Sequence, residues 1–336
     1  MDANCTHLNP FLSLAQGAAM LKIAEAFGSF GTYADEASSE SLGEQLPQRF
    51  DAGINYFNSG LDGSGNKDDD KTAASRTNYF RETYAYGADI RADGIQAFLE
   101  HLPLAETARQ LSGCNNIVPA IVYANLLVPG QELAIHTDVP EFRGANRKLY
   151  PQWLLVCMLH SGLFDAWRIP IQTCVSWFGD ATGGAFTFYP EGASAARQSI
   201  PVTHNTAIML DTDKVFHGVE RVQQVLPDLP TIGRETRLHF CGDGQWELRE
   251  GDAVLAQYNW GQLRYSISWK AYCFEDEAKE ALWHEGSDDL TLEMILSTLE
   301  GELRERGALS GDRPDPTSFA LLLVEQFIHF PSAAAA

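Results

Sequence analysis

The sequence is short of positive charge. Its 336 residues include 24 Lys and Arg against 45 Asp and Glu, which gives a formal net charge of −21. A nucleic-acid-binding protein needs a basic surface that displaces counterions from phosphates, and the sequence has no Lys/Arg cluster of that kind. An anionic lipid surface is disfavoured for the same reason. The composition therefore predicts neither a nucleic-acid partner nor a membrane partner.

Long apolar runs, a basic leader and paired cysteines are also missing. The longest apolar stretches, near 117–128 and 319–330, are too short or too interrupted to span a bilayer. The first residues include an acidic one and no basic region followed by an apolar run, so no secretory signal is expected. The six cysteines form no CxxC pair, which favours reduced thiols. We therefore expect a cytoplasmic protein, with 331–336 as a disordered tail.

What the chain has instead is a long β-rich stretch between helical flanks. From 117 to 274, short runs of β-branched and aromatic residues alternate with Gly, Pro and Asp turns. Apolar residues at helical spacing occur before this stretch and after it. We predict a mainly β fold with flanking helices, in which an antiparallel sandwich or barrel forms the core. Its parts are an N-terminal helical and loop extension that packs on the core (1–116), the β core (117–274) and C-terminal helices (275–330).

The residues with the clearest chemical meaning lie in the segment LAIHTDVPEF. His136 and Asp138 are two positions apart, so on a strand both side chains point to the same face. His217 lies in a second β-rich run, KVFHGVERV. Two imidazoles and one carboxylate on one face of a metal form the facial triad of non-haem Fe(II) oxygenases. An H-x-D tripeptide alone also occurs in ordinary surface turns, so the neighbouring motifs must decide.

Four motifs in order resemble the Fe(II)/2-oxoglutarate-dependent dioxygenases, specifically their prolyl-4-hydroxylase-like branch. They are HTD, a GG-x5-PEG segment over 183–192, H-x-V-x-x-V from His217, and R-Y-x-I-x-W from Arg264. The resemblance covers about 117–274 and implies a double-stranded β-helix core of the jelly-roll or cupin-like kind. It implies catalysis at Fe(II) bound by His136, Asp138 and His217, with 2-oxoglutarate and O2 as cosubstrates and ascorbate as a candidate reductant.

The resemblance further implies a basic residue on a late strand that pairs with the distal carboxylate of 2-oxoglutarate. Arg264 takes that place, and Ser266 lies two residues on, on the same strand face. A planar guanidinium can fork onto a carboxylate, and a hydroxyl adds a further hydrogen bond. Tyr123 and Asn125, on the strand before HTD, are additional candidates for contacts with the cosubstrate.

Two gaps between consecutive motifs are longer than is usual in this family. Asp138 and His217 are 79 positions apart, so an insertion that reaches to about Trp167 must loop out or add strands. His217 and Arg264 are 47 positions apart, and we attribute this gap to a predicted hairpin, WELREGDAVLAQY. Arg237 therefore stays a rival for the carboxylate, and Arg221 a weaker one.

The implied reaction is oxidation, by default hydroxylation, of an unactivated C–H bond of a small molecule, with conversion of 2-oxoglutarate to succinate and CO2. Two alternatives stay open: a protein or peptide hydroxylase of the same class, and a non-catalytic cupin-like metal-binding or interaction protein. The segment 76–87 is a structural hairpin or a pocket wall for an anionic or aromatic substrate. The C-terminal helices are a candidate homodimer contact. Candidate substrate residues are Arg76, Arg81, Phe142, Arg143 and Arg168.

Overall fold

Antiparallel sheet dominates the structure, a computed structural model that describes residues 5–33, 49–61, 65, 67–223 and 229–331. The larger sheet has the order β1 (Cys5–Leu8), β12 (Thr206–Leu210), β9 (Ile171–Phe178), β17 (Arg264–Phe274), β5 (Asn116–Leu127), β3 (Phe80–Tyr86), β2 (Ser29–Thr32), β14 (Thr236–Gly242), β15 (Gln245–Glu250) and β16 (Ala253–Asn259), with β4 (Asp89–Ile90) on β3. The smaller sheet has the order β11 (Gln198–Ile200), β10 (Phe186–Phe188), β13 (His217–Val219) and β6 (Leu133–His136).

Eight of these strands follow the path of a jelly roll. The chain runs from β5 in the larger sheet to β6 in the smaller one, and then through β9, β10, β11, β12, β13 and β17. Side chains from both sheets meet in one apolar cluster, which includes Trp177 of β9, Phe186 and Phe188 of β10, and Ile208 of β12. The predicted mainly β, jelly-roll fold with flanking helices is therefore confirmed, although no barrel is closed among the described strands.

The long gap between His217 and Arg264 is filled by additional strands. Strands β15 and β16 form the predicted hairpin, which pairs Glu250 with Ala253 across the turn. Strand β14 joins this hairpin to β2 and so extends the larger sheet. Trp246 of β15 is fully buried and packs against Phe30 of β2, which anchors the hairpin to the core.

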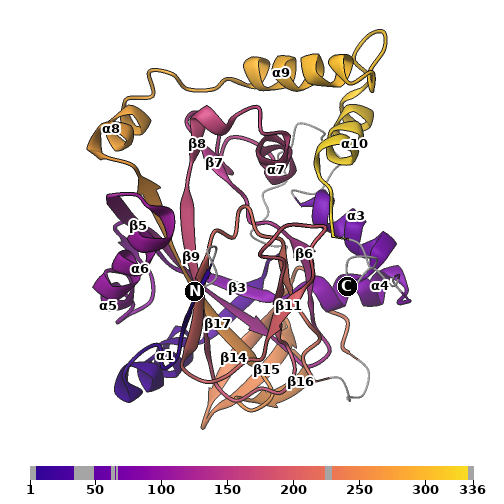
Figure 1. The fold of residues 1–336 in the computed structure, drawn as a ribbon. Helices are drawn as coiled ribbons and strands as arrows, with labels where there is room; N and C mark the ends of the chain where they lie inside the picture. Colours follow the sequence, from indigo (N-terminus) through magenta and orange to yellow (C-terminus); the bar gives the residue numbers. More distant parts are fainter. Residues whose placement is uncertain (1–4, 34–48, 62–64, 66, 224–228, 332–336) are drawn as a thin grey trace.

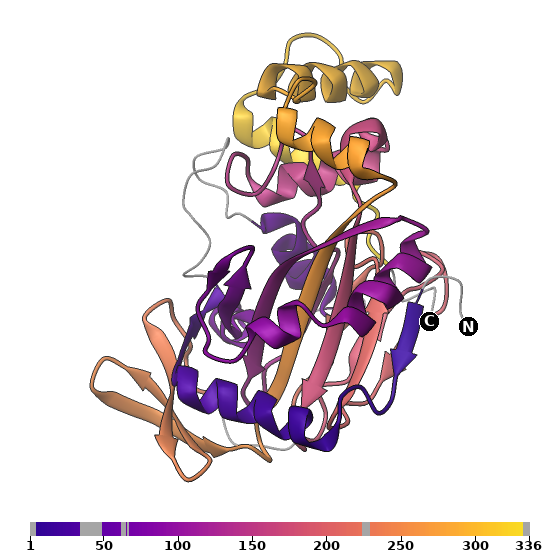
Figure 2. The ribbon, with the colours of Figure 1, turned by 90° about the vertical axis from the view of Figure 1, so that its left-hand side faces the viewer.

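One face of the larger sheet is covered by helices from the N-terminal part of the chain. These are α1 (Leu14–Phe27), α5 (Gln96–Leu99) and α6 (Leu102–Ser112), which lie across the strands in Figure 2. Ser13 and Gln16 form a capping box at the start of α1, and Gly28 ends it in the left-handed conformation. The indole of Trp269 on β17 donates to the carbonyl of Leu99 over 2.8 Å. The segment before 116 thus contributes strands as well as helices.

The insertion after the HTD motif folds as a helix. Helix α7 (Gln152–Ser161) is buried along nearly its whole length because α9 (Leu292–Glu305) and α10 (Pro316–Phe327) pack against it. The two-stranded pair of β7 (Glu141–Phe142) and β8 (Arg168–Ile169) lies at its base, beside the 3₁₀ turn η1 (Asp165–Trp167). These helices and α8 (Glu277–Glu285) gather at one end of the molecule in Figure 1.

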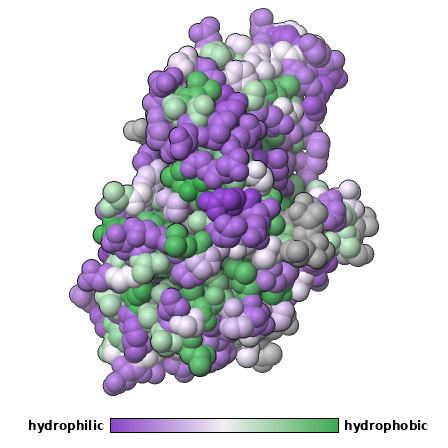
Figure 3. Space-filling view, turned by 60° about the vertical axis from the view of Figure 1, so that its left-hand side comes forward, coloured by the Kyte–Doolittle hydropathy of each residue, from purple (hydrophilic) through white to green (hydrophobic). Residues whose placement is uncertain are grey.

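The outer surface is mostly hydrophilic on the face that Figure 3 shows. Hydrophilic residues prevail on the face shown in Figure 3, above all over the helical end, and hydrophobic residues are scattered between them. Within the described ranges, no helix combines the length and the apolar character that a bilayer crossing requires.

Helices α3 (Phe50–Ser59) and α4 (Asp70–Thr77) lie against β6, close to the candidate site.

Candidate metal centre

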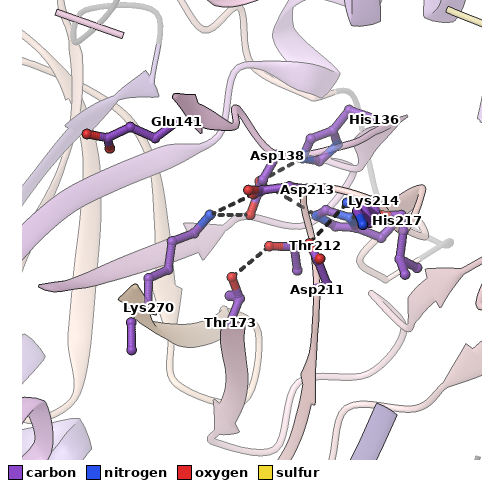
Figure 4. A network of polar contacts seen from close by, with 12 residues as sticks. His136, Asp138, Glu141, Thr173, Asp211, Thr212, Asp213, Lys214, His217 and Lys270 are labelled. Carbon is purple, nitrogen blue, oxygen red and sulfur yellow. Dashed lines mark hydrogen bonds and ion pairs between the residues drawn. The ribbon is translucent and has the colours of Figure 1, made fainter. Parts of the chain in front are cut away.

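Two neighbouring strands bring the three predicted ligands together. His136 on β6 lies directly opposite His217 on β13, with ring centroids 4.4 Å apart. Asp138 follows β6, and its Oδ1 lies 3.6 Å from Nε2 of His136 and 3.8 Å from Nε2 of His217 (Figure 4). All three donor atoms lie within 4.8 Å of one another. This spacing suits a single cation bound at about 2.0–2.2 Å from each ligand atom.

Backbone carbonyls orient both imidazoles. Nδ1 of His136 lies 2.7 Å from the carbonyl of Ala134, and Nδ1 of His217 lies 2.8 Å from the carbonyl of Val215. An Nδ1–H that donates to a carbonyl leaves the Nε2 lone pair free for a metal. Burial, reinforced by His136, lowers the pKa of His217 to about 3, so its ring is neutral at pH 7. The donor set therefore fits a divalent transition metal.

Lys270 forms an ion pair with the carboxylate of the triad. The sequence did not single out this lysine. Nζ of Lys270 lies 2.7 Å from Oδ2 of Asp138, and the backbone N–H of Asp138 donates to the carbonyl of Thr212 over 2.8 Å. Burial acts to raise the pKa of Asp138, but Lys270 and the two histidines outweigh it and hold that pKa well below its usual range. Asp138 is therefore an anion ready to bind a cation.

The residues predicted to hold 2-oxoglutarate line one cavity with the triad. Arg264, Ser266, Tyr123 and Asn125 all face this cavity. Strands β17 and β5 pair antiparallel, which places Ser266 opposite Asn125 and Ser268 opposite Tyr123. The period of two along a strand explains the arrangement, because Arg264, Ser266, Ser268 and Lys270 then share one face of β17. That alternation in RYSISWK is the signal from which Lys270 could have been found.

Arg264 is a buried cation that has no carboxylate partner among the described residues. Its side chain is 2% exposed; Nε donates to the carbonyl of Gly184 over 2.6 Å and Nη1 to Oγ of Ser266 over 3.3 Å. Nη2 has no hydrogen-bond partner among the described residues. Burial lowers the pKa of Arg264 to about 9, so the guanidinium stays charged at pH 7. A buried, unpaired charge is costly, so this end of the cavity favours an anion.

Neither a family model nor a curated protein matches the sequence. Solved structures with a similar fold include a 2OG-Fe(II) oxygenase-family oxidoreductase from Burkholderia pseudomallei (11% identity, 58% of this chain and 66% of that one, TM-score 0.33). Others are a prolyl-4-hydroxylase from Pseudomonas putida (11%, 81% and 92%, 0.37) and HygX from Streptomyces hygroscopicus with nickel, 2-oxoglutarate and hygromycin B (9%, 81% and 84%, 0.40). Likeness at this level assigns no activity to this chain, whose own residues must supply the argument.

The rival arginine already has a carboxylate partner. Nη2 of Arg237 lies 3.1 Å from Oε1 of Glu82, and its Nε donates to Oγ of Ser29 over 3.0 Å. Its side chain is 39% exposed on β14, whereas Arg264 is buried in the cavity of the triad. Of the two arginines, Arg264 is the one that lines the cavity of the triad.

The candidate substrate residues divide between the site and other parts of the fold. Arg81 lines both the cavity that holds Arg264 and the triad and a larger cavity of about 220 Å³ beside the triad, and its guanidinium lies 3.8 Å over the ring of Tyr123. Phe142 is buried in the core of the helical end. The remaining three arginines pair with carboxylates: Arg76 with Asp68, Arg143 with Asp288, and Arg168 with Asp211.

Sequence reasoning missed most of the wall of the larger cavity. Helix α3 and the residue before it contribute Arg49, Tyr56 and Phe57, and the insertion contributes Arg147. Arg49 is fixed by Asp51 through two contacts of 3.0 Å. No local pattern links this helix to the HTD motif, because the contact between α3 and β6 forms only in the folded chain.

Gly184, beside Arg264, is expected not to tolerate a side chain. Its φ is +64°, and a Cβ would lie 2.6 Å from Cδ of Arg264. Gly192 is the matched control, because its φ is +94° but a Cβ there meets nothing within 4 Å. Both alanine variants should lose about 1 kcal/mol or more from the positive φ, and Gly184→Ala a further 1–3 kcal/mol, roughly, from overpacking. Urea unfolding measures the difference, and equal losses would contradict the close contact.

Proposed function

We propose that this chain is an Fe(II)- and 2-oxoglutarate-dependent oxygenase that oxidises, most simply hydroxylates, a C–H bond of a small molecule. The observation that carries the proposal is the pairing of two features in one cavity. These are the His136–Asp138–His217 cluster and the buried Arg264, which meets no carboxylate in the part of the chain that the structure describes. A protein that only stores a metal has no use for a buried, unpaired guanidinium. A dianionic cosubstrate that reaches from a metal to a cation uses both.

Each residue then has a defined role. His136 Nε2, Asp138 Oδ1 and His217 Nε2 would hold the metal, while Arg264 and Ser266 would hold the distal carboxylate of 2-oxoglutarate. Bound iron supplies the oxidising chemistry, in which one atom of O2 enters succinate, the other enters the substrate, and CO2 is released. The chain itself orients the ligands, anchors the cosubstrate and limits the access of water.

The larger cavity supports a small-molecule substrate. It measures about 220 Å³, borders His136 and Asp138, and is lined by aromatic side chains that include Tyr33, Tyr56 and Tyr79. The rings of Tyr33 and Tyr79 stack with centroids 5.3 Å apart. A concave aromatic cavity with a few cationic groups matches the usual character of a small-molecule site. We therefore place the oxidised molecule between α3 and the triad.

The direct test uses the protein without its unknown substrate. Under anaerobic conditions, Fe(II) and 2-oxoglutarate are expected to give a visible metal-to-ligand charge-transfer band that neither gives alone. Admission of O2 with ascorbate should then give slow, uncoupled formation of succinate, measured by mass spectrometry. A sample that contains Fe(II) but no protein is the control. Absence of both the band and the succinate would overturn the proposed function.

A further inference from the structure

The structure places a buried lysine beside two carboxylates at the candidate metal centre. Lys270 lies 2.7 Å from Oδ2 of Asp138 and 4.0 Å from Oδ1 of Asp213, as Figure 4 shows. Asp213 is fully buried, and its carboxylate makes no hydrogen bond within the described part of the chain. Arg168 lies 3.6 Å from its Oδ2. Asp138, Lys270, Asp213 and Arg168 therefore follow one another at distances of 2.7, 4.0 and 3.6 Å, and burial raises the pKa of Asp213 to about 7.

This arrangement divides the two oxygens of Asp138 between two tasks. Oδ1 faces the two imidazole nitrogens, at 3.6 and 3.8 Å, whereas Oδ2 faces the ammonium group of Lys270. A carboxylate can bind a metal through one oxygen or through both. With Oδ2 engaged by a buried cation, the carboxylate cannot turn to offer both oxygens without breaking an ion pair in a low-dielectric environment.

Stability alone does not explain the ion pair. Buried ion pairs contribute little net stability compared with apolar residues of similar volume, because both charges lose their hydration. Asp213 lies 4.0 Å from Lys270 and, in its anionic form, offsets part of the repulsion between the ammonium group and a bound cation. Contacts between a metal ligand and residues that do not themselves touch the metal orient that ligand and influence what else the metal can bind.

We propose that Lys270 is a positioning residue that keeps Asp138 a monodentate ligand, bound to the metal through one oxygen. The remaining coordination positions of the metal then stay open for cosubstrates. The role of the open positions rests on the proposed function, whereas the restraint on Asp138 follows from the contacts of Lys270 alone. A second bound oxygen would occupy a position that 2-oxoglutarate or O2 needs. Loss of Lys270 should therefore change the coordination of the metal and weaken cosubstrate binding.

Co(II) is the probe, because its visible absorption reports coordination number and geometry without turnover. The wild type is compared with Lys270→Met, Lys270→Arg and the control Lys148→Met, which removes an exposed lysine that lies over the ring of Tyr86. We expect Lys270→Met to change the Co(II) spectrum and to raise the Kd of 2-oxoglutarate by about 10- to 100-fold. Lys270→Arg, which keeps the charge, should restore most of both properties, and Lys148→Met should change neither.

A wild-type Co(II) spectrum and 2-oxoglutarate affinity in Lys270→Met would overturn the proposal and leave the lysine a structural residue. Circular dichroism checks the fold of each variant, and Lys270→Gln replaces the methionine variant, with the same expected changes, if that variant does not fold. The two proposals fail separately. If wild-type Co(II) protein does not respond to 2-oxoglutarate, the proposed function fails, but the spectral comparison still tests the restraint on Asp138.

Discussion

Replacement of Asp138 by asparagine is expected to weaken metal binding by on the order of 100-fold and to abolish succinate formation. Four-ligand protein sites bind Zn²⁺ with a binding free energy of about 10–16 kcal/mol. Loss of one donor should therefore cost roughly 3 kcal/mol or more of binding free energy, because Asp138 is the only anion among the three ligands. Asparagine keeps the shape of the side chain next to Lys270, whereas alanine would also leave a space in a buried site. Anaerobic calorimetric titration with Co(II) measures the change.

The fold of Asp138→Asn must be compared with that of the wild type in the same experiment. Removal of one partner of a buried ion pair destabilises a protein by roughly 3–5 kcal/mol, although Asp213 still lies 4.0 Å from Lys270. Asp288→Asn is the matched control, because it breaks the ion pair with Arg143, a pair that lies outside both cavities. Wild-type Co(II) affinity in Asp138→Asn would show that the metal does not use the triad.

Local sequence rules were sufficient for the pairs that lie two positions apart. Arg264 and Ser266 share one face of β17, and Asp138, just past the end of β6, still lies 3.6 Å from His136. The position of His217 did not follow in this way, since its pairing with β6 is a long-range contact. Only the motif order, through the resemblance, brought it to the other two ligands.

The insertion after HTD shows why periodicity can fail. The residues of α7 are apolar on all sides, and the helix is correspondingly enclosed by α9 and α10. A short apolar run without an exposed face reads equally well as a buried strand or as a buried helix segment. The helical fold is decided by packing partners more than 100 residues further along the chain.

The excess of acidic residues explains why three of the predicted substrate arginines are paired with carboxylates. In a chain with 45 acidic and 24 basic residues, a cation readily finds a carboxylate. Arg76, Arg143 and Arg168 have done so with Asp68, Asp288 and Asp211. Scarcity of cations therefore does not single out a functional arginine. The informative property is a buried cation without an anion, which only the folded structure reveals, and Arg264 has it.

Replacement of Arg264 by methionine is expected to raise the Kd of 2-oxoglutarate by about 100-fold or more. Hydrogen bonds to charged groups contribute about 1.5–3 kcal/mol each, and every 1.4 kcal/mol is a factor of about ten in affinity. Metal binding should be unaffected, because Arg264 is not one of the three ligands. Titration of 2-oxoglutarate into the Co(II)-loaded protein, followed by calorimetry, measures the loss.

Without cosubstrate, the same substitution is expected not to lower the stability of the protein. Methionine replaces a buried charge that has no anionic partner, so the free energy of unfolding should stay the same or rise, because apolar side chains often substitute for buried charges without loss. Arg237→Met is the control: it breaks a half-exposed pair with Glu82 and should leave the 2-oxoglutarate affinity within about twofold. If instead Arg237→Met loses affinity and Arg264→Met binds 2-oxoglutarate as the wild type does, the carboxylate belongs to the strand of Arg237.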